Sequence, residues 1–283
     1  MIPEAPAGTS VCVSVVVHES ELDCLASALT HLFRSLSDAV SRGLLARARV
    51  TLHDNGSSPE YQSLLNALHQ RMRFDAPPWL EWTLCLSDEN PGFGSAHNQA
   101  LGGIAEAYLL ILNPDVELAP DAIGAGLEYL GVHESVVALN PRCDRADGGP
   151  EFLCKRSPSI FDLFLRGFAP TAIKTRYSRR LGRYEYRDSP RNDAREVELL
   201  SGACLLCRRE AFHRVGGFDD RYFLYFEDFD LALRLRAEGA LHYEPSMGVI
   251  HYGGFAAQKG WRHRVWFIRS AIRFFATHGW RLR

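Results

Sequence analysis

Apolar residues recur along the first half of the chain in two alternating patterns. Short runs in which nearly every residue is apolar or β-branched predict strands buried on both faces, whereas apolar residues at steps of three and four predict amphipathic helices. The runs lie at 11–17, 50–53, 81–87, 108–112 and 136–139, and the helical stretches at 22–36, 61–72, 94–107 and 120–130. Repeated strand–helix units need right-handed crossovers, so the pattern predicts an α/β fold with a mostly parallel sheet flanked by helices.

The pattern weakens after residue 141. Residues 155–195 contain eleven Lys/Arg against four Asp/Glu and show little periodicity. Such a segment is typical of a mobile, solvated insertion over a cleft, and a charged surface loop with no role is the alternative. Regular patterns return as a strand at 198–207 and a helix at 228–238. We also expect residues 1–10 to be disordered.

The end of the chain is basic. Residues 259–283 contain seven Lys/Arg and no Asp/Glu. One helical stripe is apolar and a second face carries Arg262, Arg269 and Arg273. Segment 256–283 is therefore expected to form a basic amphipathic helix, which favours contact with an anionic membrane surface. Packing on the domain and a dimer contact are the alternatives. The apolar stripe consists of Trp261, Val265, Ile268, Ile272 and Phe275.

Composition excludes several classes of protein. With 283 residues, 46% hydrophobic and 23% charged, the chain is neither wholly disordered nor collagen-like. A net charge of −2 gives no indication of a nucleic-acid partner. The first residues lack the features of a signal peptide, and no apolar stretch is long enough to span a membrane.

The seven cysteines are scattered, as expected for reduced thiols in a cytoplasmic protein. Cys204 and Cys207 form a CxxC inside a predicted buried strand. Because no second Cys or His pair lies at ligand spacing, we expect neither a zinc site nor a redox site there.

Polar residues gather where the predicted parallel strands end. They include His18, Asp54, residues 88–90, Asn113 and Asp115. Ligands of open α/β sheets bind beyond the carboxyl ends of the strands, so these residues are expected to share one cleft.

Two residues of this kind are candidate metal ligands. Asp115 directly follows a buried strand, where a carboxylate could hold a divalent cation together with a bound diphosphate. An Asn-Pro-Asp sequence is also common in turns that connect a strand to a helix without any role in binding. His251 follows a short apolar run and precedes two glycines, and it is either a second metal ligand or a structural histidine. The metal interpretation requires that His251 meets Asp115.

Three acids within four residues make 227–230 a candidate catalytic segment. Glu227, Asp228 and Asp230 follow an aromatic run at the start of a predicted helix. One acid there is explained as a helix cap, but three are not. Crowded carboxylates beside apolar rings can raise the proton affinity of one of them, as a general base requires.

The segment 90–98 is a glycine-bearing loop that opens a helix, which suits a nucleotide or phosphate. It is not the dinucleotide fingerprint of dehydrogenases, because His97 stands where the third glycine would be and the loop follows the third strand rather than the first.

Taken in order, these blocks resemble family 2 of the inverting glycosyltransferases, which have the GT-A fold, and most closely its branch of bacterial rhamnosyltransferases. The matching segments are VSVVVHES (13–20), LHDNGSS (52–58), NPGFGSAHNQAL (90–101), LLILNPDVEL (109–118), the segment 200–239 and VIHYGG (249–254). The resemblance implies a glycosyltransferase domain at 11–255, with a nucleotide-sugar-binding half at 11–140 and an acceptor and catalytic half at 141–255.

The resemblance also implies a role for each matching residue. Asp228 would be the catalytic base with Glu227 beside it, and Asp115 and His251 would hold Mg²⁺ or Mn²⁺. Asn113 replaces the first acid of the family's Asp-x-Asp motif, so one position is neutral. The donor-binding residues would be His18, Asp54, Asn90, Gly92, Asn98, Asn113, Ser201 and Gly202.

The activity implied is metal-dependent transfer of a sugar with inversion, in a single displacement. The leading donor is deoxythymidine diphosphate (dTDP)-rhamnose, and the acceptor is a hydroxyl of a glycan or lipid-linked glycan in bacterial cell-surface polysaccharide synthesis. Such an enzyme would be cytoplasmic, at the inner face of the cytoplasmic membrane. The alternatives are another UDP- or GDP-sugar donor, and a non-catalytic sugar-nucleotide-binding scaffold. A nucleotidyltransferase would need a glycine-rich basic loop after the first strand, and residues 18–23 contain none.

Overall fold

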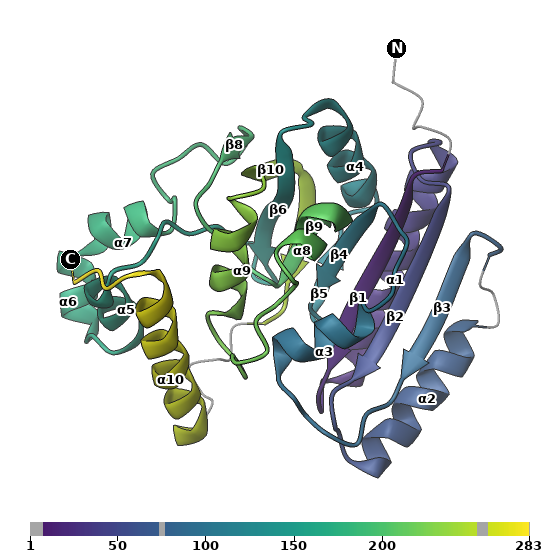
Figure 1. The fold of residues 1–283 in the computed structure, drawn as a ribbon, viewed down its shortest axis with the longest axis horizontal. Coiled ribbons are helices and arrows are strands. Elements are labelled where there is room, and N and C mark those ends of the chain that lie inside the picture. Colours follow the sequence, from purple (N-terminus) through teal and green to yellow (C-terminus); the bar gives the residue numbers. More distant parts are fainter. Residues whose placement is uncertain (1–7, 74–76, 254–259, 283) are drawn as a thin grey trace.

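The computed structural model describes residues 8–73, 77–253 and 260–282, and it has a twisted central sheet with helices on both faces (Figure 1). The strands are β1 Ser10–Val17, β2 Arg47–Asp54, β3 Leu80–Cys85, β4 Tyr108–Leu112, β5 Val116–Leu118, β6 Val136–Arg145, β7 Pro150–Glu151, β8 Arg195–Glu196, β9 Cys204–Arg208 and β10 Ala240–His251. The helices are α1 Leu22–Ser41, α2 Pro59–Arg73, α3 Phe93–Ala100, α4 Ala122–Val132, α5 Ile160–Gly167, α6 Thr171–Arg176, α7 Ser178–Tyr184, α8 Arg209–Arg214, α9 Glu227–Leu235 and α10 Trp261–His278.

The sheet has the order β3-β2-β1-β4-β9-β6-β10-β5. The pairs β3–β2, β2–β1 and β1–β4 are parallel, as predicted, whereas β9 runs antiparallel to both β4 and β6. The carboxyl ends of β1, β2 and β4 therefore lie at one edge, where the polar residues gather.

Alternate residues of β4 explain why its run is wholly apolar. Leu110 and Leu112 pack in the core beneath α1, α2 and α4, whereas Leu109 and Ile111 pack on the other face with α3, α8 and α9. Since successive side chains of a strand point to opposite faces, a strand covered on both sides needs apolar residues at every position. The predicted α/β sheet with helices on both faces is confirmed.

Neighbouring leucines of α2 allow a direct test of this packing. Leu65 is fully buried, whereas Leu64 is 56% exposed. Leu65→Ala is expected to lower the free energy of unfolding by about 3 kcal/mol, because it leaves a cavity in the core. Leu64→Ala should cost under about 0.5 kcal/mol. Chemical denaturation of both variants measures the difference, and equal losses would contradict the burial of Leu65.

Two predicted elements are shorter in the structure. The helix expected at 94–107 ends at Ala100, because Gly103 adopts a left-handed φ of 69° that a helix cannot continue through. The strand expected at 198–207 begins only at Cys204. The amides of Ser201 and Gly202 donate to side chains, those of Asn140 and Asp228, rather than to a neighbouring strand.

Other elements were not predicted. β10 is twelve residues long and lies inside the sheet between β6 and β5, and the insertion predicted at 155–195 contains α5, α6 and α7. Ser10 already belongs to β1, so the disorder expected for residues 1–10 is wrong at that residue, while residues 1–7 lie outside the described part of the chain.

Helix α10 packs against the domain and also keeps an apolar stripe exposed. Phe274 and Phe275 are buried with Tyr222 and Phe226. Of the predicted stripe, Phe275 is therefore buried, whereas Trp261, Val265, Ile268 and Ile272 are 73%, 40%, 48% and 54% exposed. No helix among the described residues has both the length and the apolar character needed to cross a bilayer.

Candidate active site

The turn after β4 places the first metal candidate beside the second. His251, the last residue of β10, pairs with Val116 of β5, so the strand register brings it next to Asp115. Its Nε2 lies 3.4 Å from Asp115 Oδ1, and the amide of Tyr252 donates to the Asp115 carbonyl at 2.9 Å. The meeting of His251 with Asp115 that the sequence analysis required is present in the structure.

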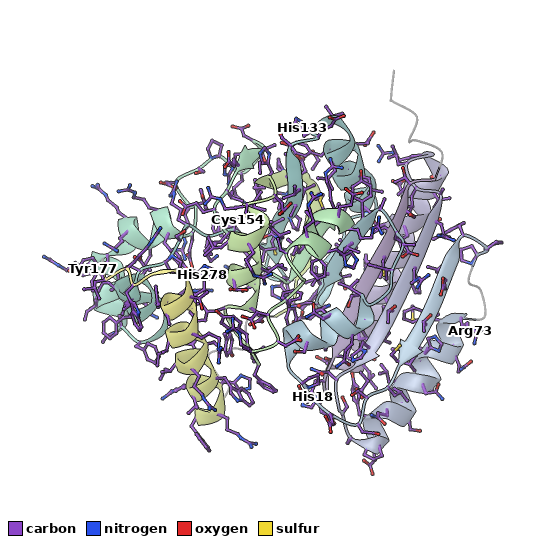
Figure 2. All side chains as sticks on the ribbon, viewed as in Figure 1. His18, Arg73, His133, Cys154, Tyr177 and His278 are labelled. Atoms are coloured by element: carbon purple, nitrogen blue, oxygen red, sulfur yellow. The ribbon has the colours of Figure 1, made fainter. Side chains whose placement is uncertain are left out.

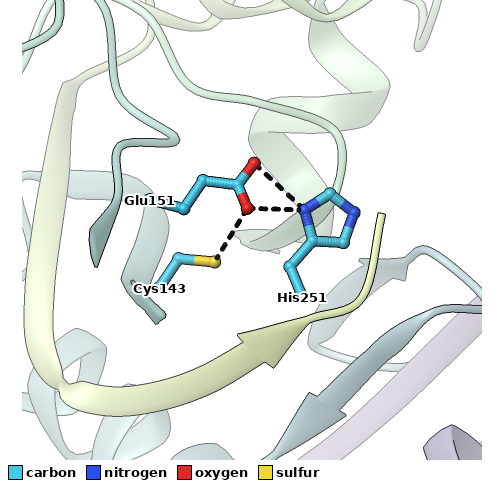
Figure 3. Close-up of side chains that lie close together, drawn as sticks. All are labelled: Cys143, Glu151 and His251. Atoms are coloured by element: carbon cyan, nitrogen blue, oxygen red, sulfur yellow. Dashed lines mark hydrogen bonds and ion pairs between the residues drawn. The ribbon is translucent and has the colours of Figure 1, made fainter. Parts of the chain in front are cut away.

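A third group holds the other side of the imidazole. Both carboxylate oxygens of Glu151, in β7, lie 3.1 Å from His251 Nδ1 (Figure 3). The His251 side chain is only 12% exposed. Burial by itself lowers the pKa of His251, but the hydrogen bonds and charges of Asp115 and Glu151 raise it to about 9. The imidazole is therefore fixed between two carboxylates.

The space around His251 Nε2 and Asp115 is suited to a small cation. A side chain at Gly253 would place its Cβ 2.5 Å from Nε2 and 2.6 Å from Asp115 Oδ2, so only glycine fits there. Oδ1 of Asn113 is buried and accepts no hydrogen bond from the described residues, and Oδ1 of Asp115 is buried with His251 Nε2 at 3.4 Å. Carboxylate and amide oxygens with one imidazole suit Mg²⁺ or Mn²⁺.

Cys143 completes a group of three potential ligands with Glu151 and His251, whose ligand atoms lie within 4.8 Å of one another. Burial raises the pKa of the Cys143 thiol above its ordinary value, so the group stays protonated. A neutral thiol is a poor ligand for a hard cation. The oxygen and nitrogen donors of the site are therefore the candidate ligands.

The candidate base lies at the first turn of α9. Asp228 Oδ2 accepts from the Gly202 amide at 3.1 Å, and Oδ1 accepts from the Phe229 amide at 2.9 Å. Burial raises the pKa of Asp228 although these amides and the charge of Arg166 lower it. A partly buried carboxylate with a raised proton affinity is suited to accept a proton.

Glu227 is the buried neighbour of Asp228. It is 5% exposed, and its Oε2 has no hydrogen-bond partner among the described residues. Burial and the charge of Asp228 raise its pKa well above the ordinary value. The two residues before α9, Tyr225 and Phe226, have left-handed φ values of 72° and 66°, a costly conformation that tertiary packing holds at this turn.

One cavity is lined by members of both groups, although His251 and Asp115 themselves are not in its wall. It has a volume of about 190 Å³, and its wall includes both Glu151, which contacts His251, and Asp228. Arg166, Lys155 and Ser201 also line it. Three segments that are far apart in the chain therefore meet at one cavity.

Some of the predicted donor-binding residues lie together at the ends of β2 and β3. Asp54 is fully buried and accepts from the Ser57 amide at 3.1 Å, while its Oδ1 has no partner among the described residues. Asn55 Nδ2 donates to Asn90 Oδ1 at 3.0 Å, which links the two loops. Gly92 has a φ of 101°, and a Cβ there would lie 2.3 Å from the Phe223 carbonyl oxygen, so the loop packs against the segment that leads to α9.

Two others occupy different surroundings. The side chain of Asn98 bonds both the amide and the carbonyl of Phe218 at 2.9 Å, and it donates to Asp220, which makes it a brace for that loop. His18 is exposed beyond the end of β1, at the opposite end of the molecule from His133 (Figure 2).

Sequence reasoning missed residues that structure brings to the site. Glu151 lies in a short hairpin after two glycines, and no spacing marks it. Asn140 is fully buried and holds the 201–204 turn by donating to the carbonyls of Ser201 and Cys204. The one feature of the sequence that could have pointed to Asn140 is its position as a single polar residue at the end of an apolar run.

The sequence of this chain matches known proteins over most of its length. Residues 12–216 match the family model described as Glycosyl transferase family 2. The chain is 31% identical over 237 residues to N-acetylglucosaminyl-diphospho-decaprenol L-rhamnosyltransferase of Mycobacterium tuberculosis, covering 79% of this chain and 71% of that protein. It is 30% identical over 197 residues to rhamnosyltransferase WbbL of Escherichia coli (strain K12), covering 65% and 70%.

Solved structures share the fold. GalNAc-T7 with UDP, GalNAc and Mn²⁺ matches with a TM-score of 0.65 and 13% identity over 95% of this chain, which spans about half (48%) of that one. The mannosyltransferase PcManGT from Pyrobaculum calidifontis, in complex with GDP-Man and Mn²⁺, matches with a TM-score of 0.58 and 19% identity over 93% of this chain and 64% of that one.

Proposed function

The chain belongs to glycosyltransferase family 2, and from that premise we propose that it transfers L-rhamnose from dTDP-rhamnose to a hydroxyl of a glycan or lipid-linked glycan. The predicted family, GT-A-like fold and enzyme class are confirmed. Rhamnose is favoured because both curated relatives described above are rhamnosyltransferases. A lipid-linked acceptor is favoured because the M. tuberculosis relative is named for a diphospho-decaprenol acceptor.

The cavity shared by Glu151 and Asp228 is the observation that carries this proposal. Asp228 accepts the proton of the acceptor hydroxyl while that oxygen attacks the anomeric carbon from the face opposite the donor diphosphate. The new carbon–oxygen bond forms as the bond to the diphosphate breaks, so the configuration inverts and dTDP leaves. Glu227 lies beside this base, and burial and the charge of Asp228 raise the pKa of Glu227.

The metal requirement is also part of the proposal. Asp115 and His251 would hold Mg²⁺ or Mn²⁺, which would offset the charge of the departing diphosphate. Glu151 fixes the imidazole so that Nε2 faces Asp115. Asp54, Asn90, Gly92, Asn113, Ser201 and Gly202 are the proposed walls of the donor pocket, with His18 and Asn98 at its margin.

Glu151→Gln tests the orienting contact. Loss of a partner behind a metal-ligating histidine typically weakens metal binding by 10- to 100-fold, so we expect about a tenfold rise in the Mn²⁺ dissociation constant. Calorimetry with Mn²⁺ in the presence of dTDP measures it. Asp144→Asn is the matched control, because Asp144 lies in the same hairpin but pairs with Arg191. An unchanged Mn²⁺ affinity in Glu151→Gln would remove Glu151 from the metal site.

Donor identity is tested by incubating the protein and Mn²⁺ with dTDP-rhamnose, UDP-N-acetylglucosamine or GDP-mannose and a diphosphate-linked N-acetylglucosamine acceptor. We expect transfer from dTDP-rhamnose with inversion. Transfer from a UDP- or GDP-sugar instead would establish the runner-up donor, for which the ligands of the two structural neighbours are the supporting observation. Donor binding with neither transfer nor hydrolysis would indicate a non-catalytic scaffold.

We further propose that the enzyme works in the cytoplasm at the inner face of the membrane. The exposed stripe of α10 and the arginines beside it support contact with anionic lipid. Flotation with phosphatidylglycerol vesicles tests this, and equal recovery with neutral vesicles would exclude the electrostatic contact.

A further inference from the structure

A second hollow lies between α10 and the segment that leads to α9. It has a volume of about 770 Å³, and its wall includes Arg221, Phe223, Trp266, Arg269, Arg273 and Thr277. We call it the arginine groove. Its size is within the range of small-molecule sites, and it is separate from the cavity that contains Asp228.

The arginine groove carries positive charge that the protein does not neutralise. Arg221 pairs with Asp219 at 2.7 Å, but Arg269 and Arg273 form no ion pair with any residue that the structure describes. The nearby buried acid, Asp230, forms ion pairs with Arg234 and His278, each at 2.7 Å. One guanidinium group can donate two parallel hydrogen bonds to phosphate oxygens. Two arginines without ion pairs on one helix therefore suit a phosphate or diphosphate.

The arginine groove and the catalytic cavity are lined by different residues of the same two segments. The segment 221–229 contributes Phe223 to the groove and Asp228 to the cavity, while α10 contributes Trp266 to the groove and Phe267 to the cavity. The rings of Phe223 and Trp266, which both line the groove, lie 4.7 Å apart. The groove and the cavity are therefore formed by neighbouring residues of the same two segments.

The outer rim of the groove is apolar. Ile272 lines the groove and is 54% exposed, and Ile268, one turn earlier on α10, is 48% exposed. A ligand that suits this surface combines an anionic head with a hydrocarbon tail that leaves along the helix.

We propose that the arginine groove binds the diphosphate of a polyprenyl-diphosphate-linked acceptor, so that the acceptor sugar reaches Asp228. This inference rests on the proposed function and names the acceptor class for that site. Arg269 and Arg273 hold the phosphate oxygens, and the exposed stripe of α10 faces the membrane from which the lipid comes.

Vesicle binding of two double variants tests the proposal. Arg269→Gln/Arg273→Gln removes the free guanidiniums, and Arg262→Gln/Arg264→Gln removes the same charge from exposed positions of α10 outside the groove. Phosphatidylcholine vesicles contain either decaprenyl diphosphate or phosphatidylglycerol at equal total charge. We expect the wild type to bind the diphosphate vesicles about tenfold more tightly, the groove variant to lose this preference, and the control variant to keep it.

Equal binding of the wild type to both vesicles would overturn the proposal, because the groove would then be a general anionic surface. An equal loss of preference in both variants would overturn it as well. Hydrolysis of dTDP-rhamnose without acceptor separates this outcome from failure of the proposed function. The groove variant should hydrolyse donor at the wild-type rate, while its KM for the lipid-linked acceptor rises about tenfold and its KM for dTDP-rhamnose stays unchanged.

Discussion

Asp228→Asn is expected to lower kcat for sugar transfer by roughly 1,000-fold, in the range for removal of a general base. The amide cannot take the proton of the acceptor hydroxyl, so the attacking oxygen is not activated. Asparagine keeps the shape of the side chain and one oxygen that can accept from the Gly202 amide, which lies 3.1 Å from Asp228 Oδ2. The loss should therefore fall on the chemical step and not on folding.

Two measurements separate these effects. Calorimetry with dTDP and Mn²⁺ should give the wild-type dissociation constant for Asp228→Asn, because the asparagine oxygen can still accept from the Gly202 amide of the proposed donor pocket. Asp121→Asn at the exposed start of α4, where the side chain forms no cap, serves as the control and should keep full activity. Turnover of Asp228→Asn at the wild-type rate would show that another group accepts the proton.

The pH profile gives an independent check on Asp228. Its pKa is raised by burial, and the base works only when ionised, so kcat/KM should rise with pH through a value above that of an ordinary aspartate. Arg166 lowers this pKa, so Arg166→Gln should move the acidic limb to higher pH. Glu227→Gln should move it less, because the pKa of Asp228 is shifted by burial, by backbone amides and by Arg166 rather than by the charge of Glu227. If Arg166→Gln leaves the acidic limb of the pH profile at the wild-type pH, Asp228 is not the group that titrates.

Two of the strands that the sequence predicted are buried along almost their whole length. The runs at 11–17 and 108–112 became β1 and β4 because both faces of each are covered, so every position is apolar. β10 escaped prediction because its pairing is irregular: the register with β6 shifts between Glu244 and Gly248, around Pro245. Such a strand is held by its neighbours in space, and a local pattern does not show them.

The candidate site divides in the same way. Asp115, Asp228 and His251 were predicted because each follows a strand end or opens a helix, places where local sequence and function coincide. Glu151 could not be predicted, since its importance comes only from its contact with His251, 100 positions later in the chain. Asn98 matched the family's pattern, yet its amide is used by the loop at Phe218. A motif identifies a position, and the structure shows how that side chain's hydrogen bonds are used.

His251→Gln is expected to weaken Mn²⁺ binding, measured with dTDP present, by about 100-fold and to lower kcat/KM at limiting metal to a similar degree. The glutamine removes the imidazole that lies between Asp115 and Glu151. The two carboxylates then lack a group that fixes their positions, and the site loses its nitrogen donor. Raising the Mn²⁺ concentration should restore much of the activity, which an unfolded protein could not show.

A second histidine of β10 supplies the control. His242 hydrogen-bonds Tyr129 at 2.8 Å, whereas His251 contacts Asp115 and Glu151. His242→Gln should therefore bind Mn²⁺ and turn over donor as the wild type does. Electron paramagnetic resonance of bound Mn²⁺ gives a readout that does not depend on catalysis. If wild type and His251→Gln bind Mn²⁺ equally, or if the wild type is fully active in excess chelator, the metal role of Asp115 and His251 fails and their contact is only structural.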